Sequence, residues 1–141
     1  RALAGRLGRP ILWLCALVEA ELAGLEGDDQ AEFLAAYDLT RPASERFVRT
    51  AFALLDQICF FTVGPDEVRA WPIPRETSAR RAARTIHSDL EKGFIRAEVV
   101  DVDTLLAHGS EAKCKAAGVL RVEGKDYVVR DGDVINVRFN I

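Results

Sequence analysis

Methionine is absent from all 141 residues of the chain, which begins at Arg1. Composition alone does not explain this absence, so we expect the chain to be a piece of a longer protein. Long apolar runs are absent as well: the best one, residues 11–18, is far shorter than the ~20 residues that a membrane-spanning helix needs. No secretory signal pattern occurs either. These absences predict a cytoplasmic protein with no membrane partner.

Cysteine is scarce and widely spaced. Cys15, Cys59 and Cys114 form no C-x-x-C pair, so the sequence predicts neither a zinc site nor a disulfide framework, and no other metal site is indicated. We expect the three thiols to be reduced. Cys114 lies between Lys113 and Lys115, whose charges would favour a thiolate if the side chain is exposed. Under that condition it is a candidate for redox sensitivity rather than for catalysis.

Neither sign of charge dominates the chain, because 19 basic and 22 acidic residues give a formal net charge of −3. This value excludes a uniformly basic nucleic-acid-binding protein but not a local basic patch. Residues 1–56 hold 6 basic and 9 acidic groups, whereas residues 57–141 hold 13 of each. Within residues 69–98 there are 7 basic groups against 4 acidic ones, so a basic surface is expected there.

The pattern of residues 1–56 is mainly helical. It predicts a short helix over residues 1–8, a second from Glu19, a third capped by Asp29 and a fourth capped by Ser44. The buried side of the fourth helix would carry Phe47, Val48, Ala51, Phe52, Leu54 and Leu55. The apolar run at residues 11–16 predicts one strand buried on both faces. A lone strand cannot make a sheet, so its neighbours are expected outside this chain.

The pattern changes near Gln57, after which strands predominate. We predict strands over residues 59–63, 68–73, 94–100, 119–122, 127–130 and 134–141. A helix over residues 78–92 would end at Gly93, Asp101 or Asp103 would cap a short helix, and residues 112–117 would form another. Two strands, a helix and then further strands follow the β-grasp order. The fold class is therefore predicted to be α+β.

Seven blocks occur in a characteristic order: Phe60-Phe61-Thr62, Glu67-Val68-Arg69-Ala70-Trp71, Ile86-His87-Ser88-Asp89, Gly93 to Val99, Glu123 to Tyr127, Asp131 to Val134 and Arg138-Phe139-Asn140. Over about residues 10–141 the sequence thereby resembles the C-terminal region of the YchF family of Obg-like ATPases. The resemblance implies that residues 57–141 form a TGS domain, a ubiquitin-like β-grasp module. It also implies that residues 1–56 are the end of a P-loop nucleotide-binding (G) domain.

The same resemblance implies that ATP and Mg²⁺ are cofactors of the intact protein. It places Cys15, Ala16 and Leu17 at a nucleotide-binding loop, although Leu17 stands where the family often has lysine. The chain itself contains no G-x-x-x-x-G-K-[ST] loop, and so lacks the backbone cradle for phosphates and the Mg²⁺ ligand of a P-loop. We therefore predict that this chain alone neither binds ATP tightly nor hydrolyses it, and no catalytic residue is assigned.

Basic side chains gather on the predicted 78–92 helix. Arg80, Arg84 and His87 are spaced i, i+4, i+7 and share one face opposite the apolar stripe, with no acidic residue between Thr77 and Ser88. The candidate RNA- or ribosome-binding residues are Arg80, Arg81, Arg84, His87, Lys92 and Arg96.

Charge alone fits an ordinary solvated helix face equally well. The resemblance favours RNA, because TGS modules are associated with RNA and with ribosome-bound proteins. The expected partners are therefore the ribosome or RNA, together with the upstream ATPase domain of the same protein. The alternative is a protein-interaction or regulatory domain that docks on that ATPase domain.

Overall fold

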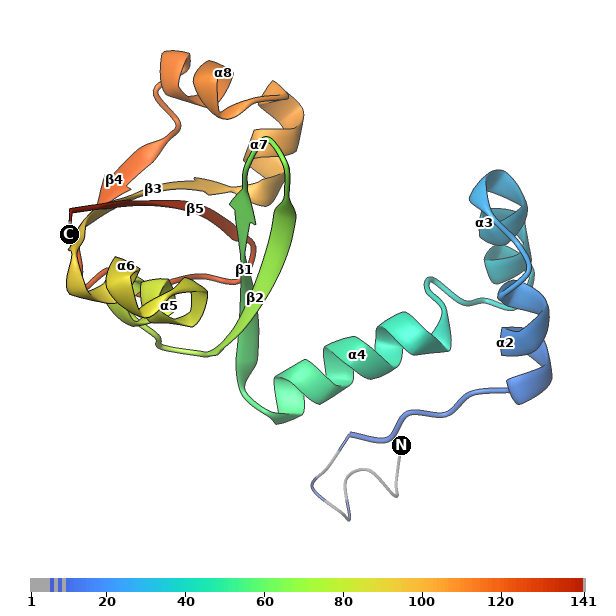
Figure 1. Cartoon of the computed structure of the whole chain (residues 1–141). Helices are drawn as coiled ribbons and strands as arrows, with labels where there is room; N and C mark the ends of the chain where they lie inside the picture. Colours follow the sequence, from blue (N-terminus) through green and yellow to red (C-terminus); the bar gives the residue numbers. More distant parts are fainter. Residues whose placement is uncertain (1–5, 7, 9, 141) are drawn as a thin grey trace. The chain divides into compact units, whose positions relative to one another are not determined.

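The computed structural model describes residues 6, 8 and 10–140, and the chain divides into two compact units (Figure 1). Unit 1 is Arg1–Leu54 and unit 2 is Leu55–Ile141. The helix predicted over residues 1–8 lies largely outside the described residues. No helix in the described part of the chain is both long and apolar enough to cross a membrane.

The described residues of unit 1 include the helices α2 (Ala16–Leu22), α3 (Gly27–Ala36) and α4 (Ala43–Leu54). The helices predicted from Glu19, Asp29 and Ser44 are present, but each begins one to three residues earlier than expected. Glu26 rather than Asp29 occupies the N-cap position of α3.

The strand predicted for residues 11–16 is wrong. Residues 10–15 form no strand, Trp13 is 82% exposed, and α2 already begins at Ala16. A strand must pair its backbone groups with a neighbour, and the other described segments of unit 1 are helices and their connections. The apolar run therefore has no neighbouring strand among the described residues with which its backbone could pair.

The buried face predicted for α4 is also largely wrong. Phe47, Val48 and Leu54 are more than half exposed, and so is Leu55 just beyond the helix. Ala51 and Phe52 are half-buried, and Ala43 at the first position is the one fully buried residue of α4. The helix is amphipathic, as the sequence predicts, but most of its apolar face is uncovered within unit 1.

Unit 2 is built on a mixed five-stranded sheet in the order β2-β1-β5-β3-β4. The strands are β1 (Gln57–Val63), β2 (Val68–Pro74), β3 (Phe94–Asp101), β4 (Arg121–Glu123) and β5 (Asp133–Phe139). β1 runs parallel to β5, and the other neighbouring pairs are antiparallel. The α+β class is thus confirmed.

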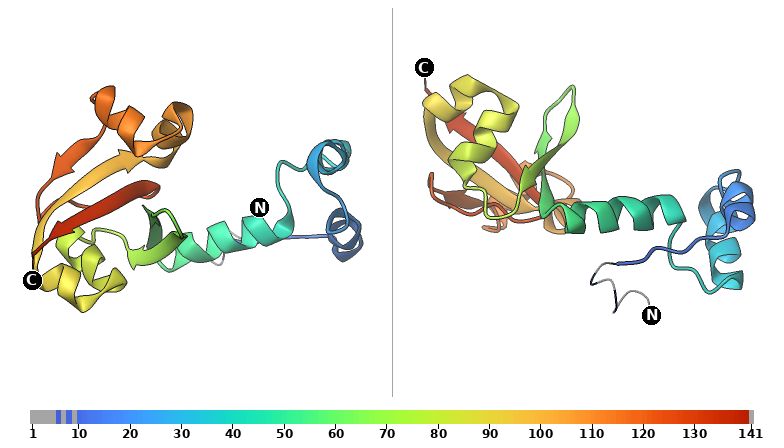
Figure 2. Two further views of the ribbon diagram at one scale, coloured as in Figure 1. Left: turned by 45° about the horizontal axis from the view of Figure 1, so that its top comes forward. Right: turned by 90° about the horizontal axis from the view of Figure 1, so that it is seen from below.

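Four short helices connect these strands: α5 (Ala79–Ile86), α6 (Ser88–Lys92), α7 (Val102–His108) and α8 (Glu111–Ala116). In both ribbon views α5 and α6 lie on one side of β3 and β5, and α7 and α8 lie on the other (Figures 1 and 2). Two hydrophobic cores result. The larger one lies under α5 and contains Ile58, Phe60, Ile73, Ala79, Ala82, Ala97, Val99, Val129 and Ile135.

The second core joins α7 and α8 to the sheet. It contains Val100, Cys114 and Val134, with Phe61 and Leu105 among the residues packed around it. Cys114 is 0% exposed there, so the redox role considered for it is wrong. Burial in an apolar core keeps oxidants away from the thiol, whatever the charges of the flanking lysines.

The single helix predicted over residues 78–92 is interrupted at His87. The backbone of His87 is extended (φ −162°, ψ 144°), and its ring Nδ1 accepts a hydrogen bond of 3.2 Å from the amide of Asp89. His87 therefore ends α5 and caps α6. The spacing of apolar residues does not reveal the interruption, because Ile86 and Leu90 are four residues apart whether the segment is one helix or two.

The strand predicted over residues 127–130 is not formed, apart from an isolated bridge between Val128 and Ser78. The amides of Ala79 and Val129 donate to the carbonyls of Tyr127 and Thr77. The backbone of this segment therefore bonds to the residues at the start of α5 and does not pair with β4.

Candidate functional site

The first candidate region is the loop before α2, where the nucleotide-binding residues were predicted. Cys15 is exposed at the N-cap position of α2, Ala16 is the first helical residue and Leu17 is 70% exposed. Beside them lies a hollow of about 450 Å³, whose wall includes Trp13, Cys15 and Tyr37. Its lining is mainly apolar and includes no glycine-rich turn.

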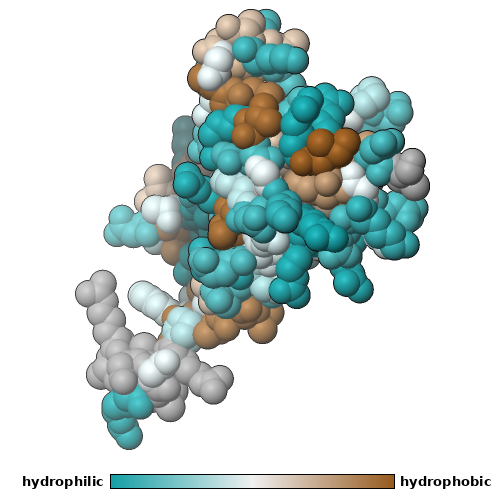
Figure 3. Space-filling view, turned by 90° about the vertical axis from the view of Figure 1, so that its left-hand side faces the viewer, coloured by the Kyte–Doolittle hydropathy of each residue, from teal (hydrophilic) through white to brown (hydrophobic). Residues whose placement is uncertain are grey.

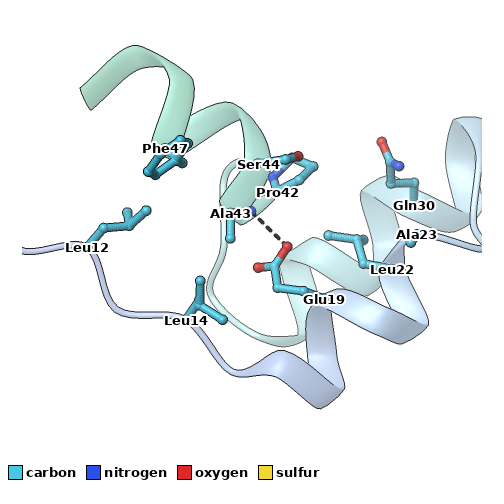
Figure 4. A pocket seen from close by; sticks show the side chains of 10 residues that line it. All are labelled: Leu12, Leu14, Glu19, Leu22, Ala23, Gln30, Pro42, Ala43, Ser44 and Phe47. Carbon is cyan, nitrogen blue, oxygen red and sulfur yellow. Dashed lines mark hydrogen bonds between the residues drawn. The ribbon is translucent and has the colours of Figure 1, made fainter. Parts of the chain in front are cut away.

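Glu19 fixes the geometry of this region. Its Oε2 accepts a 2.8 Å hydrogen bond from the amide of Ala43, which satisfies a free N–H at the start of α4 (Figure 4). Arg46 lies near the other oxygen, with Nη2 3.5 Å from Oε1. Each carboxylate oxygen of Glu19 thus contacts a residue of α4, so Glu19 joins α2 to α4.

These residues could contact one edge of a nucleotide base through backbone groups, but they could not hold its phosphates or a metal ion. α2 has only seven residues and carries Glu19 in its first turn, which disfavours an anion there. Among the described residues, no three histidine, cysteine or acidic side chains are grouped so that they could bind a metal ion. This chain therefore supplies at most a fragment of a nucleotide site.

The second candidate region is the basic surface of unit 2. The alanines of α5 (Ala79, Ala82 and Ala83) are buried, while Arg80, Arg81 and Arg84 are exposed. The positive charge of α5 is therefore not part of the core. Arg81 and Arg84 border a hollow of about 340 Å³ that also includes Arg75, Thr77 and Thr85.

Two carboxylates of α6 lie close to these basic side chains and partly neutralise them, which the sequence analysis did not predict. Glu91 lies 3.6 Å from the guanidinium of Arg84, and its carbonyl accepts a 3.3 Å bond from Arg80 Nε. Asp89 lies 3.7 Å from Lys92 Nζ. The break at His87 brings these acids back toward α5.

The six predicted basic residues do not form one patch. His87 uses its ring to cap α6, and Lys92 ends that helix. Arg96 belongs to β3, where the alternation of side chains directs it away from the core under α5. Its directly opposite residue is Arg138 of β5, which the sequence analysis did not select. The signal was available, because Arg138 lies between apolar Val137 and Phe139 on an alternating strand.

The counterion of Arg138 is Glu98, whose side chain is largely buried. Its Nη2 donates a 2.8 Å hydrogen bond to Glu98 Oε2. This bond is the main reason why the pKa of Glu98 lies below its usual value, and the charges of Lys115 and Arg96 act in the same direction.

A separate polar cluster ties β4, β5 and the 124–132 loop together. Asp133, 2% exposed, accepts 2.8 Å bonds from the Tyr127 hydroxyl and the Arg130 amide, and Arg121 Nη2 lies 3.3 Å from its other oxygen. Burial and the bond to Asp133 raise the pKa of Tyr127. Every partner is occupied by another member of the cluster, so we assign it a structural role.

Comparison with known proteins gives one family match. The family model YchF-GTPase_C, described as "Protein of unknown function (DUF933)", matches residues 57–140. The chain is 44% identical over 141 residues to the "Ribosome-binding ATPase YchF" of Pasteurella multocida, covering 100% of this chain and 39% of the relative. It is 45% identical over 134 residues to the "Obg-like ATPase 1" of Oryza sativa subsp. japonica, covering 95% and 34%.

A solved structure agrees with these matches. The structure of the Schizosaccharomyces pombe YchF GTPase superposes with a TM-score of 0.69 at 31% sequence identity, covering 84% of this chain and 31% of that one. The chain thus spans about two fifths or less of the length of the proteins it matches.

Proposed function

Because the chain belongs to the YchF family of Obg-like ATPases, we propose that unit 2 is the ribosome- or RNA-facing module of a longer nucleotide-hydrolysing protein. The relative from Pasteurella multocida, which is named a ribosome-binding ATPase, supports the choice of partner. The observation that carries the proposal is the separation of roles on α5: its alanines fill the core, while Arg80, Arg81 and Arg84 are exposed. Contacts to phosphates provide much of the affinity for nucleic acid and need no particular base sequence.

The test is co-sedimentation of the 141-residue chain with ribosomes and with ribosomal RNA across a salt series. Replacing Arg80, Arg81 and Arg84 by glutamate is expected to abolish sedimentation at low salt without unfolding unit 2. Each lost phosphate contact should also reduce the slope of log affinity against log salt by roughly 0.7–0.9. A charge-matched control replaces the exposed residues Lys113, Lys125 and Arg130 by glutamate.

If both triple variants sediment like the wild type, the basic surface is a solvated helix face and the RNA proposal is wrong. Docking on the ATPase domain is then the better proposal, and it predicts binding to that domain in trans with little dependence on salt.

For unit 1 we propose the role of the end of the nucleotide-binding domain, with ATP and Mg²⁺ held mainly by upstream residues in a cytoplasmic protein. The exposed apolar face of α4 supports this proposal, because such a face is normally covered by a neighbouring element. The chain alone should release no phosphate from ATP, since it has no P-loop. A phosphate-release assay checks this expectation, and turnover above the buffer rate would contradict it.

A further inference from the structure

The sheet face under α7 and α8 changes from apolar to charged along β3 and β5. Three directly opposite pairs follow one another: Val100 with Val134, Glu98 with Asn136, and Arg96 with Arg138. Side chains two residues apart in a strand share a face, so all three pairs lie on this side of the sheet. The first pair belongs to the second core, whereas both arginines of the third pair are exposed.

The Arg96–Arg138 pair is unfavourable by itself, because like charges directly opposite in a ladder repel each other. Glu98 bonds to Arg138 at 2.8 Å, while Arg96 forms no ion pair among the described residues. Lys115 adds a third cation near Glu98, and Glu111 of α8 is close enough to act on Arg138. The ion pairs of the described residues therefore give Arg138 a carboxylate partner and leave Arg96 without one.

Arg96 lies near the start of β3 and Arg138 near the end of β5. The start of β3 and the end of β5 meet near the C-terminus, because the amide of Asn140 donates a 2.9 Å bond to the carbonyl of Gly93. Seen from that side, unit 2 is mainly hydrophilic, with hydrophobic patches among the polar side chains (Figure 3). Two adjacent strands also hold the arginine backbones at a fixed separation, which limits the cost of ordering them on binding.

We propose that Arg96 and Arg138 form a binding site for the phosphates of a single-stranded RNA backbone, on the sheet face opposite α5. The inference rests on the proposed function and adds a second contact surface to it. Guanidinium groups bind phosphate oxygens through paired, charge-assisted hydrogen bonds. The three pairs present no aromatic side chain on which a base could stack, so the site binds the backbone without reading sequence.

The test measures binding of the 141-residue chain to a fluorescent 12-nucleotide oligouridylate by anisotropy across a salt series. R96Q/R138Q is expected to weaken binding about tenfold or more at 0.1 M salt and to lower the salt slope by roughly 1.4, the value for two phosphate contacts on a single strand. K125Q/R130Q makes the same change in charge elsewhere on unit 2. It should cost much less affinity.

Glu98→Gln supplies a test of opposite sign. It removes the carboxylate that competes for Arg138, so RNA should bind more tightly than to the wild type. Circular dichroism and urea unfolding of each variant verify that unit 2 stays folded. Tighter binding by E98Q combined with weaker binding by R96Q/R138Q supports the site, because a purely structural defect would weaken both.

Three results would overturn the proposal. If R96Q/R138Q loses no more affinity than K125Q/R130Q, while the Arg80, Arg81 and Arg84 variant loses binding, the sheet site is wrong and the proposed function stands. If the wild type does not bind the oligouridylate, the sheet site is wrong, and co-sedimentation with ribosomes tests the proposed function separately. If polyglutamate of similar length displaces the RNA at equal concentration and depends on the same two arginines, the site is for an acidic protein segment instead.

Discussion

Gly93→Ala is expected to destabilise unit 2 by about 2–3 kcal/mol, the usual cost of forcing an extra methyl group into a packed site. A Cβ at position 93 would lie 2.1 Å from the carbonyl oxygen of Asn140 and 2.8 Å from its carbonyl carbon. Both atoms belong to the backbone, so no side-chain rotation can relieve the clash. The junction between β3 and the end of β5 must open, with loss of the Asn140–Gly93 hydrogen bond.

Urea unfolding followed by circular dichroism measures this change. Gly124→Ala is the matched control, because a Cβ there meets no atom within 4 Å and Gly124 does not have a positive φ. The control should change the free energy of unfolding by less than about 0.5 kcal/mol, as most surface substitutions do. Equal stabilities of the two variants would show that the junction has room for a methyl group.

Asp133→Ala should have a still larger effect, lowering the free energy of unfolding of unit 2 by about 3 kcal/mol. The carboxylate is buried and accepts bonds from Tyr127 and Arg130 while pairing with Arg121. Alanine would leave the Tyr127 hydroxyl and the Arg130 amide without their acceptor, and Arg121 would keep only Glu123 as a counterion. The estimate is at the low end for a broken buried pair because Arg121 remains 37% exposed and can turn toward water.

The same denaturation experiment measures this prediction, with Asp126→Ala as the control. Asp126 is exposed in the 124–127 turn, and its removal should be nearly neutral. Tyr127→Phe deletes one of the bonds to Asp133 and should cost about 1 kcal/mol. A loss below about 1 kcal/mol for Asp133→Ala would mean that water replaces the carboxylate and that the cluster contributes little.

The elements that could be predicted from the sequence are those whose signal is local. β1, β2 and β3 follow clear apolar runs bounded by turns, and Asp101 caps α7 as expected, accepting bonds from the amides of Asp103 and Thr104. A capping side chain lies within a few residues of the amides it binds, so sequence spacing is enough to identify it.

The elements that failed depend on partners that the local pattern does not contain. An apolar run becomes a strand only beside another strand, and residues 11–16 have none among the described residues of unit 1. The apolar side of α4 is present in the sequence, but Phe47, Val48 and Leu54 on it remain more than half exposed. In both cases the spacing of apolar residues correctly predicts an amphipathic or apolar segment. It does not predict which neighbouring element covers the apolar side chains.

The candidate basic surface was predicted by helical spacing, which found Arg80 and Arg84, but the prediction also included Arg96, which lies on the opposite face of the sheet. The interruption at His87 depends on one side-chain hydrogen bond. The Arg96–Arg138 neighbourhood depends on a pairing between residues 42 positions apart in the chain. Strand register of that kind is decided by the whole sheet, so single-residue propensities could not reveal it.

The strand order has a consequence for synthesis of the protein. β5 is the last strand in the sequence, yet it lies at the centre of the sheet between β1 and β3. Until its residues have left the ribosomal exit tunnel, the β1–β2 hairpin and the β3–β4 pair have no strand to join them, and the larger core cannot close. Folding of unit 2 therefore waits for the last of its five strands, and the edges of β1 and β3 that pair with β5 stay open until it inserts.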